Sequence, residues 1–282
     1  MSSIAGPPSL PARRLRGRRS MQAGLCTLVT LVGLAAFAPV IAPHDPTTQN
    51  LSEDLRGPSI SHPLGQDKLG RDQLSRIIYG ARVSLLVGVT SVTITVALGV
   101  LIGALAGYAG GAADFWIMRM VDVLLAFPGI LLAIAMSAVL GPSLPHVIFA
   151  LAVIGWTGYA RLVRAEVLAI RERDHVEAAR ALGMRGSRVV LRHVLPLVAA
   201  PVVVQATFGM AGAIVAEASL SFLGLGVQPP TPSWGSMLNE GRSFLLVAPH
   251  LTLWPGVAIL ATVLGLNLLG DGLRARLDVR GA

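Results

Sequence analysis

Two long stretches without a charged residue constrain this 282-residue chain more than any other feature of its sequence. One stretch runs from Val83 to Ala113, and the other covers 38 residues from Val123 to Ala160. Inside a bilayer no water satisfies an open backbone, so apolar segments cross it as helices of about 20 residues. The first stretch therefore predicts a transmembrane helix at about 84–107.

The second stretch is too long for a single span. A turn signal from Gly141 to Pro145, with the sequence GPSLP, divides it into a hairpin of two spans. We expect Phe127, Pro128 and Gly129 to kink the first of these two spans, because a proline removes a helical hydrogen bond.

Three further segments are apolar enough to cross a bilayer: 21–43, 194–216 and 249–270. A cleaved signal peptide is the alternative for 21–43, because a basic cluster precedes it. Residues 218–247 are rich in Gly and Pro and predict an ordered re-entrant or surface loop rather than a seventh span. With 53% apolar and 13% charged residues, the sequence predicts an all-α membrane protein with six transmembrane helices.

The basic residues predict how the chain is oriented. Six spans with a cytosolic amino terminus place 17 Lys and Arg in cytosolic segments and six outside, as the positive-inside rule requires. The prediction is a disordered basic cytosolic tail at 1–20, an external loop at 44–82 and a cytosolic tail at 271–282. This topology accounts for the net charge of +8, so we expect the lipid bilayer and no nucleic acid as a partner.

A charged segment at 161–196 interrupts the apolar runs. Helical spacing within it separates three apolar from three charged side chains: Val176, Ala179 and Leu182 on one face, and Arg173, Glu177 and Arg180 on the other. Small residues at Ala178 and Ala179 would let another surface approach the backbone closely.

Gly183 ends this pattern and predicts a sharp turn between two short amphipathic helices. The second helix carries a basic stripe and leads to a proline before the next apolar run: Arg185, Arg188 and Arg192, then Pro196. From the residues alone, two interpretations stay open. The segment is gripped by a partner protein, or it lies on anionic lipid headgroups.

Residues able to perform chemistry are few. The only lysine, Lys68, precedes Leu69, so the chain has no Walker A loop of its own. The one cysteine, Cys26, and six scattered histidines predict neither a disulfide nor a metal site, and each histidine is expected to be a loop or interfacial residue. We expect no catalytic residue and no bound cofactor.

Two carboxylates near predicted span ends have alternative roles. Asp122 and Glu217 are expected to form helix-end salt bridges or to lie at the membrane interface. Glu217 alternatively lines the exit of a translocation pathway, where it would meet a peptide amine or a cation.

The charged segment resembles the EAA motif of ABC importer permeases through six of its residues: Glu177, Ala178, Ala179, Gly183, Leu195 and Pro196. His193 departs from the general motif, but the form Arg-His-x-Leu-Pro is similar to the dipeptide, oligopeptide and nickel branch. Two other segments, 62–88 and 219–244, resemble C-type permeases of that branch.

The resemblance implies a type I ABC importer permease with a core domain at 83–270 that holds five spans and a cytosolic coupling helix within 161–196. The implied partners are a homologous permease, two ATP-binding cassette ATPase subunits that use ATP and magnesium, and an extracytoplasmic substrate-binding protein. The implied location is a bacterial cytoplasmic membrane, with both termini cytosolic.

The resemblance also assigns residues and substrates. The residues expected to couple the chain to the ATPases are Glu177, Ala178, Ala179, Arg180, Gly183, Arg185, His193, Leu195 and Pro196. Those expected along the translocation pathway are Phe127, Pro128 and Glu217. Di- and oligopeptides are the expected substrates, with nickel or glutathione, or a secondary carrier, as alternatives.

Overall fold

The computed structural model describes residues 10–278, with side chains for 18–277, and its regular secondary structure is helical. The long helices are α1 (Leu10–Ala36), α3 (Gln73–Ala109), α4 (Gly111–Leu125), α5 (Gly129–Leu140), α6 (Leu144–Ile170), α9 (Leu195–Phe222) and α11 (His250–Asp278). Shorter helical elements connect them: α2 (Ala38–Ile41), η1 (Leu51–Glu53), α7 (Asp174–Ala181), α8 (Gly186–Val189), η2 (Val190–Val194), α10 (Trp234–Gly241) and η3 (Arg242–Phe244).

The predicted six-span membrane architecture is confirmed. Five helices in the described residues are long and apolar enough to cross a membrane, and α4 with α5 forms a sixth, broken candidate. The two halves of this pair meet at an angle of 79°. The bend falls at Phe127 and Pro128, where a kink is predicted, because Pro128 cannot donate a backbone hydrogen bond. The turn from Gly141 to Ser143 then leads into α6.

The predicted boundaries of the first two spans need correction. Helix α1 already begins at Leu10, so residues 10–20 are helical rather than disordered, while residues 1–9 lie outside the described part. It ends at Ala36 and not at 43. Helix α3 begins at Gln73, eleven residues before the predicted span. Asp72 is the N-cap of α3 and accepts a hydrogen bond from the amide of Ser75 at 2.7 Å. This cap stabilises a first turn that includes the charged residue Arg76.

Two later boundaries also differ from the prediction. The segment around Asp114 and Arg119, predicted as a loop, is helix α4, because charges on a helix surface do not interrupt its backbone hydrogen bonds. Helix α9 continues past the predicted end to Phe222. As expected, 218–247 adds no seventh span, since α10 has only eight residues. Predicted tail residues 279–282 lie outside the described part.

Helices α3 and α6 pack along each other through a row of small residues. Gly99, Gly103 and Gly107 recur every fourth residue and therefore share one face of α3. A Cβ added to Gly103 would lie 2.4 Å from the carbonyl oxygen of Ala160, closer than atoms can approach. The glycines thus let the two backbones come together, which is how helices associate where apolar lipid gives no hydrophobic driving force.

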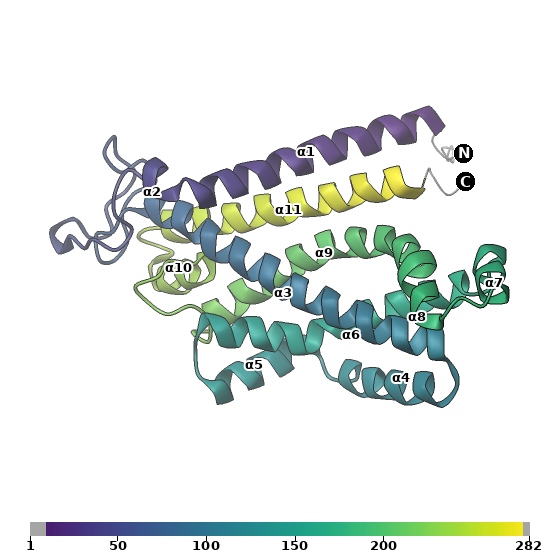
Figure 1. Cartoon of the computed structure of the whole chain (residues 1–282). Helices are drawn as coiled ribbons and strands as arrows, with labels where there is room; N and C mark the ends of the chain where they lie inside the picture. Colours follow the sequence, from purple (N-terminus) through teal and green to yellow (C-terminus); the bar gives the residue numbers. More distant parts are fainter. Residues whose placement is uncertain (1–9, 279–282) are drawn as a thin grey trace, which may run out of the picture.

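The two ends of the helical bundle differ in what they carry. Figure 1 shows the start of α1 and the end of α11 at the same end of the bundle as α7 and α8, while the long loop before α3 and helix α10 lie at the opposite end. The helices α1 and α11 run side by side between these ends. The charged segment and the predicted external loop are therefore separated by the length of the spans.

A buried network of four charged residues holds the opposite end together. Arg71 pairs with Asp67 at 2.6 Å and with Glu240 at 2.7 Å, and Arg76 pairs with Glu240 at 3.0 Å. Both arginines and Asp67 are almost fully buried, and Glu240 is mostly so. The network joins the loop, the first turn of α3 and helix α10, and two positive charges balance two negative ones.

This network gives a prediction for Glu240→Gln. Removing one member of a buried ion pair typically costs about 3–5 kcal/mol, because the remaining charge stays uncompensated. We expect the midpoint of thermal unfolding of the detergent-solubilised chain to fall by roughly 5–10 °C. The control is Glu172→Gln, whose partner Arg171 is 3.4 Å away and whose side chain is 74% exposed. Equal midpoints for the two variants would contradict a structural role of the network.

Candidate functional site

Helix α7 carries the glutamate and the alanines of the EAA-like motif. Asp174 and Glu177 lie in its first turn and Arg180 lies in its last. This order of charges is favourable, because the helix dipole is positive at the amino end and negative at the carboxyl end. The sequence thus stabilises a helix of only eight residues.

The turn after α7 depends on the conformation of Gly183. Its φ is +78°, in the region that disfavours residues with a Cβ. The amide of Met184 donates to the carbonyl of Ala179 at 3.1 Å, and that of Gly183 donates to Arg180 at 2.9 Å, which is a Schellman motif. A Cβ at Gly183 would meet no atom within 4 Å, so the requirement is conformational rather than steric. The predicted pair of helices joined at a glycine is confirmed.

One face of α7 is buried in an apolar cluster at the end of the bundle. Val176 and Ala179 pack there with residues of α3, α6, α8, η2 and α9: Ala104, Val163, Val167, Ile170, Val189, Val194, Val198 and Val202. The prediction that Leu182 shares this face is wrong. Leu182 is 87% exposed, because it lies beyond the last turn of α7 at the C-cap. Ala179 is covered by its own chain, so of the two alanines of the motif only Ala178 is exposed.

The exposed side of this segment forms what we call the α7–α8 surface. Its members are Glu177, Ala178, Arg180, Leu182, Arg185, Arg188, Leu191 and Arg192. Arg180 lies over the ring of Tyr108 with 5.1 Å to the centroid, so its guanidinium is held against the end of α3. The predicted basic stripe is exposed, and the exposed apolar side chains Leu182 and Leu191 precede and follow α8 in the sequence.

The motif residues His193, Leu195 and Pro196 lie where α8 becomes α9. Residues Val190–Val194 form a short π-helix, closed by a hydrogen bond from the amide of Leu195 to the carbonyl of Val190. Pro196 follows and has no amide to continue the regular pattern. His193 is half-buried and its ring centroid is 6.4 Å from that of His175. These three residues therefore shape the helix junction, and Pro196 alone among them is exposed.

A cavity of about 310 Å³ lies between α3, α5, α6 and α9. Glycine and aliphatic side chains make up most of its wall, with four neutral polar residues: Ser91, Thr95, Tyr159 and Gln205. The hydroxyl of Tyr159 donates to the carbonyl of Gln205 at 3.3 Å. Among the described residues, no acidic, basic, His or Cys side chain lines this cavity. The cavity therefore offers a solute neutral hydrogen-bonding groups and no carboxylate, imidazole or thiolate ligand for a bare metal cation.

The predicted pathway residues divide into two groups. Phe127 and Pro128 are exposed at the break between α4 and α5, next to Gly129, which lines the cavity. The prediction that Glu217 lines the pathway needs correction. Glu217 is fully buried, and its neighbour Ala216 lines the cavity instead. Ser221 donates a hydrogen bond to Glu217 at 2.7 Å.

The two carboxylates predicted near span ends, Asp122 and Glu217, differ in whether they form a salt bridge. Within residues 18–277 no salt bridge involves Glu217. Helix α9 continues beyond Glu217, so this residue does not form the predicted salt bridge at a helix end. Asp122 does form an exposed salt bridge, with Arg161 at 2.7 Å.

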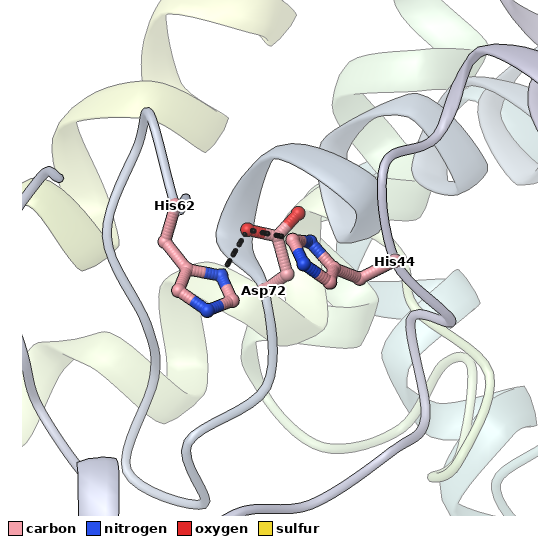
Figure 2. Close-up of side chains that lie close together, drawn as sticks. All are labelled: His44, His62 and Asp72. Atoms are coloured by element: carbon pink, nitrogen blue, oxygen red, sulfur yellow. Dashed lines mark hydrogen bonds and ion pairs between the residues drawn. The ribbon is translucent and has the colours of Figure 1, made fainter. Parts of the chain in front are cut away.

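Sequence reasoning missed a cluster at the opposite end of the bundle. His44, His62 and Asp72 place potential metal-ligating atoms within 4.8 Å of one another. Figure 2 shows the three side chains close together. They are separated by 18 and 10 residues in the sequence and meet only because the loop folds back on the start of α3. No short metal-binding sequence motif predicts such a cluster.

Comparisons with known proteins agree along the whole chain. The profile of a family described as binding-protein-dependent transport system inner membrane component matches residues 99–280. A second profile, described as the N-terminal TM domain of oligopeptide transport permease C, matches residues 12–58. The first match includes the cavity helices α5, α6 and α9 and the complete α7–α8 surface.

Individual relatives match over most of their length. The chain is 44% identical over 266 residues to a dipeptide transport system permease protein of Alkalihalophilus pseudofirmus, covering 94% of this chain and 88% of that protein. It is 45% identical to a glutathione transport system permease protein of Pectobacterium atrosepticum and 47% identical to that of Escherichia coli O6:K15:H31. Each of these two matches spans 267 residues, again 94% of this chain and 88% of the relative.

The turn after α7 gives a prediction for Gly183→Ala. An L-residue in the left-handed region costs about 1–2 kcal/mol, so the amides of Gly183 and Met184 should exchange with deuterium several-fold faster in peptides covering the turn. The control is Gly33→Ala in α1, where an added Cβ meets no atom within 4 Å and φ is not positive. Unchanged exchange in Gly183→Ala would show that the Schellman motif does not depend on glycine.

Proposed function

The chain belongs to the family of binding-protein-dependent transport system inner membrane components, and on this premise we propose that it is the permease subunit of an ATP-driven importer of di- and oligopeptides. The observation that carries the proposal is its 44–47% identity, over 94% of its length, to dipeptide and glutathione transport permeases. The subunit itself is non-catalytic and moves its substrate across a bacterial cytoplasmic membrane by alternating access.

ATP is hydrolysed by two partner ATPase subunits rather than by this chain. The absence of a Walker A loop supports this division of labour, since Lys68 is the only lysine and Leu69 follows it. ATP and magnesium are bound by those partners, and this chain holds no cofactor of its own. A second, homologous permease completes the pathway, and an external binding protein delivers the substrate.

The α7–α8 surface is the proposed contact with an ATPase subunit. Three features support it: Leu182 is an exposed apolar side chain, Ala178 leaves the backbone of α7 open, and Arg185 offers a positive charge to an acidic partner. The apolar cluster beneath makes α7 a rigid extension of α6 and α9. Closure of the ATPase dimer would thus move these helices as a unit.

The proposed orientation places the α7–α8 surface and both termini in the cytosol. The surplus of basic residues in the segments at that end supports this orientation. The loop of residues 42–72 and helix α10 then face the side from which the binding protein delivers substrate. Phe127 and Pro128 lie beside the cavity and are proposed to line the moving part of the pathway.

Short peptides are the proposed substrates, and glutathione, itself a tripeptide, is the second candidate. Relatives named for dipeptide and for glutathione transport are similar to this chain to almost the same degree. The neutral lining of the cavity favours both over bare nickel, which prefers imidazole or thiolate ligands.

The substrate proposal is tested in proteoliposomes that contain the chain with its genomic partner subunits and binding protein. We expect ATP-dependent uptake of a labelled dipeptide, inhibited by an excess of unlabelled dipeptide. Competition by glutathione at similar concentration would favour the second candidate. Uptake driven by a proton gradient without ATPase subunits would contradict the importer and identify a secondary carrier.

The coupling proposal is tested by Leu182→Asp. A carboxylate transferred into an apolar contact is strongly unfavourable, so the yield of co-purified ATPase subunits should fall at least tenfold. The control is Leu246→Asp, because Leu246 is fully exposed between η3 and α11 at the opposite end of the bundle. Normal ATPase assembly with Leu182→Asp, or equal losses in both variants, would refute the proposed contact.

A further inference from the structure

Three side chains at the end opposite the α7–α8 surface converge on one point. The Nδ1 atom of His62 lies 2.9 Å from Oδ1 of Asp72, and that of His44 lies 3.8 Å from the same oxygen. Figure 2 shows both rings turned toward this carboxylate, His62 from the loop and His44 from the segment after α2. The rings themselves are stacked, with 4.5 Å between centroids and 28° between planes.

We propose that His44, His62 and Asp72 form a binding site for a divalent transition-metal ion such as Zn²⁺. Zinc bound to nitrogen and oxygen at about 2.0–2.1 Å in a tetrahedron separates its ligands by about 3.3 Å. The two separations from Asp72, 2.9 and 3.8 Å, bracket this value. All three ligand atoms lie within 4.8 Å of one another, so binding of one ion would draw the two imidazole nitrogens closer together around it.

The ligand chemistry selects the class of metal. Two imidazoles and one carboxylate suit zinc and its neighbours in the first transition row, whereas calcium and magnesium prefer oxygen ligands alone. The side chain of His44 is 41% exposed, which gives the ion a path from solvent and a fourth position for water. In the described part of the chain, Asp72 forms ion pairs with these two histidines and with no arginine or lysine.

A second layer of hydrogen bonds already orients the ligands. The amide and the hydroxyl of Ser75 both donate to Oδ2 of Asp72 at 2.7 Å, which turns Oδ1 toward the imidazoles. The hydroxyl of Ser75 also accepts from the backbone amide of His44 at 3.0 Å. Ser75 is fully buried, so this arrangement is fixed by the fold. Such outer partners are typical of protein metal sites.

The simpler interpretation is a hydrogen bond from His62 to the capping carboxylate of α3. That interpretation leaves His44 without a role, although its ring stacks on His62 and faces the same oxygen. A bound ion would join three separate parts of the chain, the segment after α2, the middle of the loop and the start of α3. It would therefore fasten the loop that contains Asp67 and Arg71 of the buried charge network.

The proposal is tested by titrating Zn²⁺ into the full chain, purified in detergent without a polyhistidine tag, by calorimetry. We expect one saturable equivalent, and at least tenfold weaker binding for both His44→Ala and Asp72→Asn. Asparagine is a good N-cap residue, so Asp72→Asn removes the charged ligand and keeps the cap of α3. Zinc should also slow deuterium exchange in the loop of the unaltered chain and not in His44→Ala.

The matched control is His175→Ala, an exposed histidine at the other end of the molecule. It should bind zinc as the unaltered chain does. The proposal is overturned if the unaltered chain shows no saturable zinc binding, or if His44→Ala and Asp72→Asn bind normally. Loss of the zinc signal in His175→Ala would place the ion near His193 and would equally refute the site.

Discussion

The burial of Val176 and Ala179 against α6 and α9 is the contact that fixes α7 to the membrane-spanning helices, and the proposed coupling depends on it. A helix of eight residues is too short to be stable alone, and these two side chains anchor it in the same apolar cluster as Val163 and Val198. The exposed residues of α7 are thereby held in a fixed position relative to two membrane-spanning helices. A force applied to the α7–α8 surface is transmitted to the helices that line the cavity, since α6 and α9 do both. The proposed coupling therefore needs no flexible linker between the ATPase contact and the pathway.

The opposite end of the bundle is organised by polar contacts instead. There, the four-charge network and the cluster of His44, His62 and Asp72 fix a loop of irregular structure onto α3 and α10. Irregular backbone outside the membrane is hydrated, and buried charges are tolerated only because each has a partner. The two ends of the same helices thus use different physics: apolar packing at the end of α7 and α8, and paired charges at the end of the loop and α10.

The helices of this protein were largely predictable, because long apolar runs leave the backbone no alternative in a bilayer. The turn at Gly183 and the break at Pro128 were predictable for the same kind of reason, since each residue restricts its own backbone. Helix ends were not, because Asp72, where α3 begins eleven residues before the predicted span, acts through a cap that a hydropathy pattern does not reveal. The role of Glu217, the exposure of Leu182 and the grouping of His44 with His62 depend on tertiary contacts between distant segments. Such contacts leave no periodic signal in a single sequence.

In the proposed mechanism, ATP binding to partner subunits changes access to the cavity between α3, α5, α6 and α9. The most direct measurement is the labelling rate of Gly212→Cys by a membrane-impermeant maleimide in the assembled transporter, with Cys26, the only native cysteine, replaced by Ser. Gly212 lines the cavity, and a Cβ there meets no atom within 4 Å, so the cysteine fits. Under alternating access we expect the labelling rate from the external side to change at least tenfold between the nucleotide-free and the ATP-bound states. Equal rates in both states, or a rate that responds to a proton gradient without the ATPase subunits, would contradict it.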